Sequence, residues 1–352
     1  MSLVVRARAP LRLSFCGGGT DVSPYPEERG GVVLSTTIDK YAYASLEPRR
    51  DARFAIHSLD FDFVAKYPHA RNIALDGNLD LIKGVVRAFH PKKGADLYVH
   101  SDAPPGSGLG SSSTMAVATV AAFKTWLGRA LSPYEMAELA YRIERVDLAI
   151  AGGRQDQYAA TFGGFNFIEF HADSTVVNPL RIAPDTLHEL EYRMVLAYLK
   201  QTRSSAKIIE RQQASYAAGK REVVRALDAL KALTFEMKRL LLLGRIDEFG
   251  ERLHDAWLAK KHLDHGITTD PVDMLYDRAR KAGAIGGKMP GAGGGGYFVF
   301  LSRAHARAKV AQALEDAGAQ LVPFAFTPDG VTTWTAERPP ARGKPRGRAA
   351  AG

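Results

Sequence analysis

The chain has 352 residues, of which 46% are hydrophobic and 24% are charged, an ordinary composition for a globular protein with a sizeable core. No apolar run approaches the roughly 20 residues that cross a bilayer. The N-terminus also lacks the charged-then-apolar order of a signal peptide, so we expect a cytoplasmic protein without membrane contact. A single cysteine, Cys16, excludes an internal disulfide framework.

The formal net charge is +9, and much of the excess lies in residues 338–352. This segment, RPPARGKPRGRAAAG, carries five positive charges and no negative charge. Because a segment so rich in Pro, Gly and Arg cannot form a core, we expect a disordered basic tail, with weak contact to RNA or to an acidic partner as the alternative. The rest of the sequence shows no basic stripe with interleaved aromatic residues, which argues against a specific nucleic-acid partner.

Strands are predicted to dominate the first 100 residues. RARAPLRLSF, GVVLSTTIDKYAYASLEP and ARFAIHSLDFDFVA alternate or run apolar, and a helix near NLDLIKGVVRAFH and a strand DLYVHSD follow. From Ser111 the small and apolar segment SSSTMAVATVAAFKTWLG predicts a helix that stops at Gly128. The next helix has a capping box, with Ser132 at the N-cap and Glu135 three residues later, and is predicted to run to Gly152.

Helices and strands alternate in the second half of the chain. FGGFNFIEF and EYRMVLAYL return to strand, residues 205–262 are predicted to form two long helices broken near Gly244, and a third helix covers about 271–282. A strand YFVFL, a helix RAHARAKVAQALEDAG and a strand QLVPFAF complete the pattern. Strands first, then helices, then a β-α-β finish predict an α+β protein with two lobes and a boundary near 170–200.

The stretch PPGSGLGSSST, Pro104 to Thr114, has the glycines of a phosphate-binding loop but not the lysine of the common P-loop. Its three glycines permit close backbone approach to a ligand, and the last, Gly110, stands where a helix begins. Free N–H groups and the helix dipole attract phosphate there, and the hydroxyls of Ser111 and Ser112 could bind phosphate or Mg²⁺. A tight turn capped by serine is the alternative.

Two further glycine-rich loops favour a ligand site over an isolated turn. CGGGTD, Cys16 to Asp21, follows a predicted strand, and PGAGGGG, Pro290 to Gly296, precedes one. Ordering so many glycines costs conformational entropy, so such loops favour places where the backbone meets a ligand or another backbone. Each loop alone could be a hairpin, but three in one chain indicate a binding site.

Two carboxylates are candidates for chemistry beside these loops. Asp156, in GGRQDQYAATFGG, could take a proton from a substrate hydroxyl, or it could be a helix N-cap. Glu144 lies in the preceding helix, at helical spacing from Tyr141 and Leu148 on the side able to face inward. A second carboxylate near a phosphate loop could bind Mg²⁺, and a surface charge is the alternative.

Three motifs of the chain resemble those of a known enzyme family. APLRLSFCGGGTD, PPGSGLGSSST and KMPGAGGGGYFVF are similar, in order and spacing, to the three motifs of the galactokinase, homoserine kinase, mevalonate kinase and phosphomevalonate kinase (GHMP) family, over roughly residues 5–330. The resemblance implies the two-lobed α+β GHMP fold. We expect a strand-rich lobe with the glycine-loop helix at 1–185, a ferredoxin-like α/β lobe at 186–337, and the tail at 338–352.

The resemblance also implies roles for single residues. Asp156 matches the base, Arg12 the residue that supports the reacting hydroxyl and the γ-phosphate, and Glu144 a Mg²⁺ ligand, although its spacing to Asp156 is one residue longer than in mevalonate kinases. The residues matched to ATP are Pro105, Gly106, Ser107, Gly108, Leu109, Gly110, Ser111 and Ser112, and Ser112 is also matched to Mg²⁺. The residues matched to the sugar are Gly18, Gly19, Thr20, Asp21, Gly153, Gly293 and Gly294.

The segment GGGTDVSPYPEERGGVVLSTTIDKYAY resembles the D-glycero-D-manno-heptose 7-phosphate kinases. This resemblance implies transfer of the γ-phosphoryl of ATP, with Mg²⁺, to O1 of a heptose 7-phosphate, giving a 1,7-bisphosphate for nucleotide-activated heptose and surface polysaccharide. Galactokinases have Glu-His in place of Gly18-Gly19, which argues against galactose. A kinase for fucose and a non-catalytic nucleotide or sugar sensor are the alternatives, and a homodimer is left open.

A phosphorylated acceptor needs a cationic site far from the reacting hydroxyl. The segment KQTRSSAKII follows a predicted strand and opens a helix, so Arg203, Ser204, Ser205 and Lys207 could meet a phosphate at a helix N-terminus. A capped surface helix with two solvated cations is the alternative.

Overall fold

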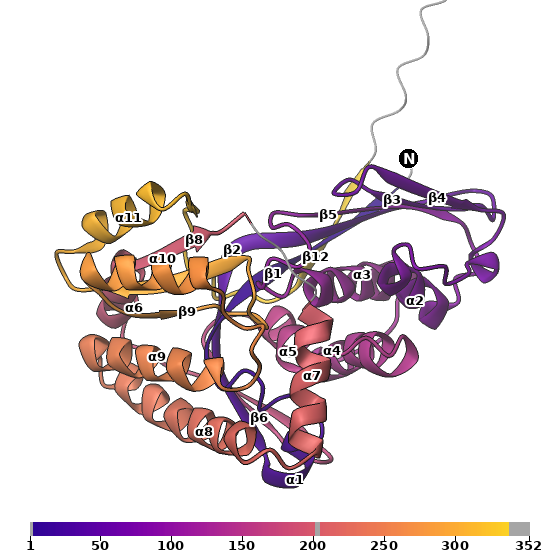
Figure 1. Cartoon of the computed structure of the whole chain (residues 1–352). Coiled ribbons are helices and arrows are strands. Elements are labelled where there is room, and N and C mark those ends of the chain that lie inside the picture. The colour runs from indigo at the N-terminus through magenta and orange to yellow at the C-terminus, as the bar shows by residue number, and fades with distance from the viewer. Residues whose placement is uncertain (1–2, 201–204, 338–352) are drawn as a thin grey trace, which may run out of the picture.

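The computed structural model describes residues 3–200 and 205–337, which form two β-sheets and the helices that cover them (Figure 1). In the larger, eight-stranded sheet β12, β1, β2, β5, β3 and β4 are neighbours in that order, while β6 pairs with β2 and β7. Its strands are β1 (Leu3–Cys16), β2 (Gly31–Pro48), β3 (Phe54–Ser58), β4 (Phe63–Tyr67), β5 (Ala95–Ser101), β6 (Asn166–Phe170), β7 (Thr175–Pro179) and β12 (Thr332–Glu337).

The two longest strands, β1 and β2, carry this sheet through the protein. They pair antiparallel along most of their length, and their register shifts after Pro10. Proline has no N–H to donate to a neighbouring strand, so a bulge is a favourable place for it. From Ala9 to Cys16 every residue of β1 is buried, including the polar Arg12 and Ser14, which stand among apolar neighbours. This half of β1 therefore delivers Arg12 and the first glycine-rich loop into the interior.

Four helices lie with the larger sheet: α2 (Asp80–Phe89), α3 (Ser111–Leu127), α4 (Pro133–Tyr141) and α5 (Gln155–Phe162). Helix α3 packs on β1 and β2 and is buried on most sides because its residues are small or apolar. It begins at Ser111 and ends where Gly128 adopts a left-handed conformation with φ 62°, so this helix prediction is confirmed.

The capping box of α4 is confirmed, but the predicted length of this helix is wrong. The backbone N–H of Glu135 donates to Ser132 Oγ at 3.2 Å, and the N–H of Ser132 donates to the Glu135 carboxylate at 2.7 Å. Helix α4 ends at Tyr141, and the chain continues as a π-helical turn, η2 (Arg142–Asp147). A π turn fits an extra residue into a helix, and it is often found at functional sites.

The smaller sheet has the strand order β11, β8, β10, β9, with all neighbours antiparallel. In chain order this is fourth, first, third, second, the order of a ferredoxin-like lobe, so that prediction is confirmed. The strands are β8 (Met194–Tyr198), β9 (Ala284–Lys288), β10 (Tyr297–Ser302) and β11 (Gln320–Leu321). The helices of this part of the chain are α6 (Pro184–Arg193), α7 (Ser205–Ala217), α8 (Arg221–Leu242), α9 (Ile246–Lys261), α10 (Asp270–Lys281) and α11 (Arg307–Asp316).

Several predicted elements differ from the structure. Residues 205–262 form three helices instead of two. Gly219 adopts φ 67° and ends a helix, as Gly244 does. The segment predicted as one strand near 52–65 forms β3 and β4, and QLVPFAF contributes only the two-residue β11. The short helices α1 (Tyr25–Arg29) and η1 (Ala70–Asn72), helix α6, and strands β7, β9 and β12 were not predicted.

The last described strand returns to the first sheet. β12 pairs antiparallel with β1, so the chain crosses back from the smaller sheet before its end. The division between 1–185 and 186–337 stays a prediction, and residues 338–352 lie outside the described residues. In the described part of the chain, no helix combines the length and apolar character needed to span a membrane.

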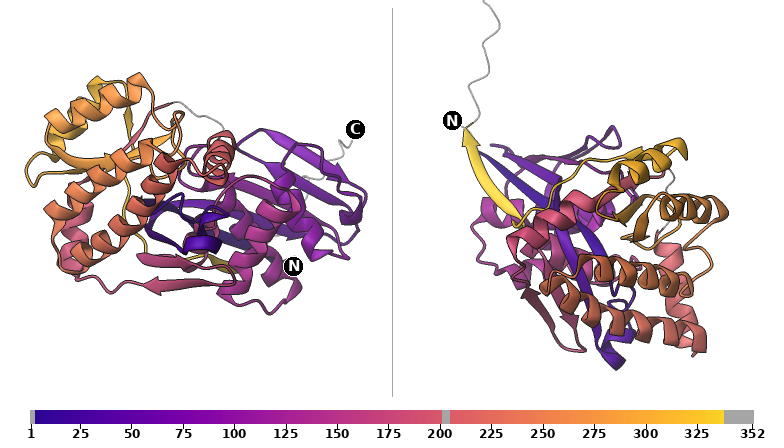
Figure 2. Two further views of the ribbon diagram at one scale, coloured as in Figure 1. Left: turned by 60° about the horizontal axis from the view of Figure 1, so that its bottom comes forward. Right: turned by 90° about the vertical axis from the view of Figure 1, so that its left-hand side faces the viewer.

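The two lobes lie side by side (Figure 2), and one hydrophobic core joins them. Phe15 of β1 stacks on Phe165 at 6.0 Å between ring centroids and meets Phe249 of α9 edge-on at 5.5 Å. Residues from both sheets belong to this cluster. Because cores are close-packed, this contact fixes α9 and the second lobe against the strand that carries Arg12.

We expect Ser132→Ala to lower the free energy of unfolding by about 0.5–2 kcal/mol, since it leaves an N-terminal N–H of α4 without its partner. Ser132→Asp retains an acceptor at the N-cap and should lose much less. Denaturant unfolding of the two variants and the parent protein makes the comparison. Equal stability of Ser132→Ala and the parent would contradict a stabilising cap.

Candidate functional site

A cavity of about 330 Å³ opens where the glycine-rich loops meet α7 and α9. The sequence-predicted site residues that line it are Arg12, Gly18, Gly19, Asp21, Gly106, Gly108, Gly110, Ser111, Ser112, Glu144, Gly153 and Asp156. The fold thus brings together residues that are up to 144 positions apart, as for Arg12 and Asp156. Both lobes contribute, because Gln212 of α7 and Lys260 of α9 also line the cavity.

The second glycine-rich loop ends at the N-terminus of α3, beside the cavity. Gly106, Gly108 and Gly110 have φ values of 73°, 88° and 75°, a left-handed conformation that other residues rarely adopt. No side chain caps this end of the 17-residue helix. Its first N–H groups, together with the helix dipole, therefore remain available to an anion in the cavity.

The third glycine-rich loop lies against the second, backbone to backbone. A Cβ on Gly291 would come within 2.5 Å of Gly108 Cα, and one on Gly296 within 2.1 Å of the Ser107 carbonyl oxygen. The N–H of Tyr297 donates to that same oxygen at 2.9 Å. Glycine is needed here because a side chain would separate the two loops.

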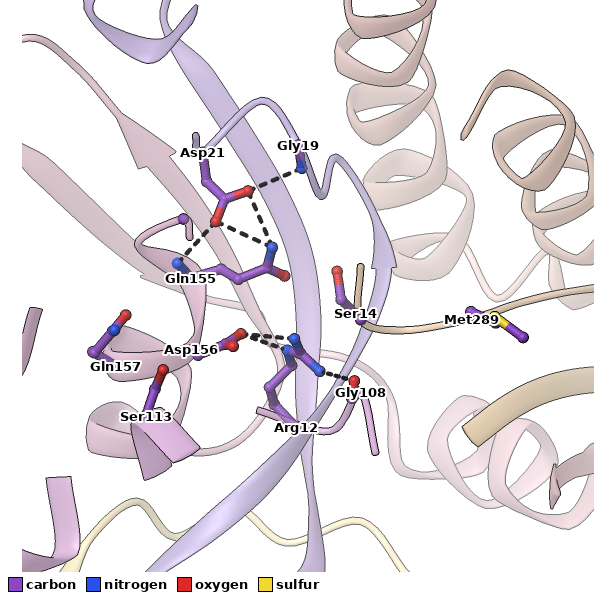
Figure 3. Close-up of polar contacts among 12 residues, drawn as sticks. Arg12, Ser14, Gly19, Asp21, Gly108, Ser113, Gln155, Asp156, Gln157 and Met289 are labelled. Atoms are coloured by element: carbon purple, nitrogen blue, oxygen red, sulfur yellow. Dashed lines mark hydrogen bonds and ion pairs between the residues drawn. The ribbon is translucent and has the colours of Figure 1, made fainter. Parts of the chain in front are cut away.

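Arg12 holds Asp156 and the second loop at once (Figure 3). Its Nε and Nη2 lie 2.8 and 2.7 Å from Asp156 Oδ1, and its Nη1 donates to the Gly108 carbonyl oxygen at 2.6 Å. The Arg12 side chain is 4% exposed and the Asp156 side chain 17%. A Cβ on Gly110 would approach Asp156 Cγ to 3.0 Å, so the carboxylate stands beside the start of α3.

Asp156 is not the N-cap of its helix. α5 begins at Gln155 with Arg154 as N-cap, and Asp156 lies in the first turn. Its carboxylate is engaged by Arg12 and faces the cavity instead. The structure therefore leaves it free of the capping role that the sequence alone could not exclude.

Glu144 lies in the π turn and is buried against α3 and α5 rather than exposed on the surface. Its Oε2 accepts hydrogen bonds from Ser113 Oγ and Gln157 Nε2, both at 2.7 Å, and Arg145 Nη1 lies 3.3 Å from its Oε1. Burial raises the pKa of Glu144, while the Arg145 charge opposes this rise. Glu144 thus lies where the π turn adds one residue to the helix.

Asp21 ties the first glycine-rich loop to the residue before Asp156. Its carboxylate accepts hydrogen bonds from the Gly19 N–H at 3.0 Å and from the Gln155 N–H and Nε2 at 3.1 Å (Figure 3). Gly153 passes so close that a Cβ there would come within 1.9 Å of Asp21 Oδ2. Asp21 thus lines the cavity and at the same time positions Gln155.

Other predicted residues do not line this cavity. The Thr20 hydroxyl is buried between the carbonyl oxygens of Gly17 and Val32, at 2.8 and 2.9 Å, so it fastens the first loop to β2 and does not line the cavity. Five other residues matched to ATP or the sugar also lie outside the cavity lining. Ser107 and Leu109 are buried, and Pro105 lines a neighbouring recess. Gly293 and Gly294 pack against Ile267. Of the residues predicted to meet an acceptor phosphate, Arg203 and Ser204 lie outside the described residues, Ser205 lines the cavity at the start of α7, and Lys207 is exposed.

The sequence reasoning missed Lys260, Gln155 and Gln212, all of which line the cavity. Gln155 flanks Asp156 but has no motif of its own. Lys260 had a usable signal, since it stands four residues after Ala256 and three after Trp257, on the buried face of α9. A lysine at an apolar helical position is unusual enough to be a candidate.

A second recess of about 230 Å³ adjoins the loop on the side of β5 and α2. It shares Ser111 and Ser112 with the cavity, and its wall is mainly apolar, with Phe61, Leu81 and Met115. The loop therefore has a polar cavity on one side and an apolar recess beside it. This pairing suits a ligand with a flat apolar part and an anionic part.

Within the described ranges, no group of three or more His, Cys, Asp or Glu residues could hold a metal ion by itself. Glu144 and Ser112 nevertheless offer oxygen atoms to the cavity. Mg²⁺ typically takes one or two protein ligands and completes its shell with phosphate oxygens and water. The donors present fit a magnesium ion that arrives with a nucleotide.

Comparison with known proteins identifies the family. Residues 80–164 match the model of the GHMP kinases N terminal domain, and residues 237–320 match that of the GHMP kinases C terminal domain. A D-glycero-alpha-D-manno-heptose 7-phosphate kinase from Campylobacter jejuni is 38% identical over 336 residues, which cover 94% of this chain and 98% of that protein.

Two further comparisons bear on fold and substrate. The crystal structure of a D-glycero-D-manno-heptose 1-phosphate kinase from Bacteroides thetaiotaomicron has a TM-score of 0.80 and 36% identity, covering 95% of this chain and 100% of that one. An L-fucokinase/L-fucose-1-P guanylyltransferase from Bacteroides fragilis is 27% identical over 85% of this chain but only 35% of its own length. The chain therefore belongs to the GHMP kinases and is an ATP-dependent sugar kinase.

Proposed function

We propose that this protein transfers the γ-phosphoryl group of ATP to O1 of D-glycero-D-manno-heptose 7-phosphate. The observation that carries the chemistry is the Arg12–Asp156 pair at the N-terminus of α3, in one cavity with the second glycine-rich loop. An anion site and a positioned carboxylate within one cavity are what phosphoryl transfer to a hydroxyl requires. The product would be a 1,7-bisphosphate, suited to the synthesis of nucleotide-activated heptose for a surface polysaccharide.

The nucleotide would lie across the second loop. Its phosphates would meet the free N–H groups of α3 and the backbone of Gly106 to Gly110, and the base would enter the apolar recess lined by Phe61 and Met115. Glu144 and Ser112 would hold Mg²⁺, which supplies positive charge to the phosphates when it is bound. The nucleotide would thus occupy both the cavity and the apolar recess, which share Ser111 and Ser112.

The acceptor hydroxyl would approach Asp156, which takes or orients its proton. Arg12 holds this carboxylate in place, and its third contact holds the Gly108 carbonyl at the phosphate loop. The pair therefore sets the distance between the proton acceptor and the phosphate site. Catalysis would consist of positioning and charge neutralisation rather than of covalent chemistry by the protein.

The cavity suits a polar sugar of some bulk. Gly18 and Gly19 present backbone where a side chain would reduce the space, and Asp21, Gln155 and Gln212 supply polar groups nearby. The names of the two heptose kinase relatives differ in the phosphate that their substrate already carries, at position 7 in one and position 1 in the other. We favour the 7-phosphate because it leaves O1 free to react.

A fucose kinase is the second candidate, supported by the Bacteroides fragilis relative. It would need the same loops and Asp156 but no site for an acceptor phosphate. The phosphate site predicted at Arg203, Ser204, Ser205 and Lys207 stays a prediction, because Arg203 and Ser204 lie outside the described residues, although Ser205 lines the cavity. A non-catalytic sensor would have no use for the Arg12–Asp156 pair in the cavity.

We expect Asp156→Asn to lower kcat by about 10²–10⁴, because the amide cannot accept the hydroxyl proton. ATP affinity should change little, because the loop backbone is unaltered. Steady-state kinetics and ATP titration calorimetry test both statements. The control is Asp147→Asn, an exposed carboxylate at the end of η2, the π turn before α5, which should keep full activity. Near-normal turnover by Asp156→Asn would remove it as the base.

The acceptor is tested with a panel of sugars and ATP. We expect kcat/KM for heptose 7-phosphate to exceed that for the unphosphorylated heptose by about 10-fold or more, as losing a charge-assisted hydrogen bond implies. ³¹P NMR of the product should show a new anomeric phosphate at C1. Equal use of both heptoses, or preferred use of fucose, would favour the neutral-sugar kinase. A product phosphorylated elsewhere would contradict the O1 assignment.

A further inference from the structure

Lys260 is a buried lysine that lines the cavity without a described role in the reaction. It lies near the C-terminal end of α9, and only 4% of it is exposed. Its Nζ donates to the carbonyl oxygens of Met289, at 3.2 Å, and of Gly291. An ammonium group has three N–H donors, so one donor remains beyond these two contacts.

No carboxylate forms an ion pair with Lys260 in residues 3–200 and 205–337. Buried cations in proteins are nearly always paired, because desolvating an isolated charge is costly. The nearby charges do not supply a partner. Arg12 is already paired with Asp156, and the Asp21 carboxylate is satisfied by Gly19 and Gln155.

Two other titratable groups face Lys260: Lys288 adds positive charge, and Cys16 adds no negative charge. Lys288 of β9 is fully buried and donates to the Ser14 carbonyl oxygen at 2.8 Å. Cys16 of β1 is buried, and burial raises the pKa of its thiol, so it carries no compensating negative charge near neutral pH. This part of the cavity therefore has cations in excess and would attract an anion.

The position of Lys260 points to the phosphate end of the cavity. Its partner Gly291 packs directly on Gly108, the residue whose carbonyl oxygen accepts the hydrogen bond from Arg12. Lys260 is thus connected through one backbone contact to the loop that stands beside Asp156. A phosphate group held by that loop would lie within the same cavity as the Lys260 ammonium.

We propose that Lys260 binds a phosphate group of a substrate and is the cation, additional to Arg12, that supports the transferred phosphoryl group. The proposal rests on the proposed function, since it assigns a further residue to the same site. The anion would supply the charge partner that Lys260 lacks in the protein alone. The contacts with Met289 and Gly291 would orient the ammonium and hold the third loop against the second.

A proton-linked effect follows from this arrangement. Burial, together with the charges of Lys288 and Arg12, lowers the pKa of Lys260 well below its ordinary value in the free protein. A bound phosphate favours the charged form and raises this pKa. Above the free-protein pKa, phosphate binding should therefore take a proton from solvent onto the Lys260 amine. Below it Lys260 is already protonated, and the uptake should disappear.

The test compares Lys260→Met, Lys260→Arg and the control Lys261→Met. Lys261 is the next residue of the same helix, and its side chain is partly exposed beside Asp273. We expect Lys260→Met to lower kcat/KM for ATP by about 10- to 150-fold, as for loss of a hydrogen bond to a charged group. Lys260→Arg should recover part of this loss, and Lys261→Met should match the parent protein. Thermal unfolding of each variant shows whether it is folded.

Titration calorimetry separates phosphate binding from a purely structural contact. ATP, ADP and heptose 7-phosphate are titrated singly, in two buffers of different ionisation enthalpy, across pH values from about 6 to 9. Proton uptake that the parent and Lys261→Met show and Lys260→Met loses would support the proposal. Loss of proton uptake with ATP but not with ADP would assign Lys260 to the γ-phosphate, whereas loss with heptose 7-phosphate alone would contradict a role at the transferred phosphoryl group.

The inference and the proposed function fail in distinguishable ways. If Lys260→Met keeps the parent's proton uptake and ligand affinities, Lys260 only supports the structure of the third loop, and the inference is overturned. A lower turnover of Lys260→Met would not change that conclusion. If the parent protein phosphorylates no sugar of the panel, the proposed function fails. The ATP and ADP titrations still decide the role of Lys260 in that case.

Discussion

The bond on which this site depends is the ion pair between Arg12 and Asp156. Arg12 uses two nitrogens on the carboxylate and a third on the Gly108 carbonyl oxygen, so one side chain sets the spacing between base and phosphate loop. Both side chains are largely buried. A buried charge without a partner is costly. The pair is therefore stable only when both residues and the loop are in place, and this makes the geometry specific.

The rest of the fold can be understood as support for that pair. The buried half of β1 holds the Arg12 backbone, and Phe15 on the same strand anchors α9 of the second lobe. Asp21, in the first glycine-rich loop, accepts hydrogen bonds from Gln155, the residue before Asp156. The third loop closes on the second at Gly291 and Gly108. Each of the three glycine-rich loops thus fixes one side of the cavity.

Much of this was predictable because it depends on local patterns. The alternating apolar residues of β1, the small residues of α3 and the Ser132 capping box each specify an element without help from distant parts of the chain. The glycine-rich motifs likewise mark backbone conformations that other residues avoid, so they pointed to the loops of the site. The family resemblance then identified Arg12 and Asp156 as partners of those loops.

What the sequence could not show was set by tertiary packing. The π turn that places Glu144 under Ser113 is a one-residue insertion that periodicity alone does not reveal. The resemblance matched Thr20 to the sugar, but its buried hydroxyl bonds to the backbone of Gly17 and Val32 and does not line the cavity. Lys260 belongs to no motif, and only the meeting of α9 with the third loop gives it a position in the cavity.

The central claim is that Arg12 and Asp156 act as one unit, and a double-mutant cycle on kcat tests it most directly. The cycle uses Arg12→Met, Asp156→Asn and the variant with both changes, with nucleotide binding measured on each to show that it is folded. Residues that act as a unit have strongly non-additive effects on catalysis. The account predicts that the double variant is about as slow as the slower single variant. Losses that multiply, with the double variant slower by the product of the single effects, would contradict it.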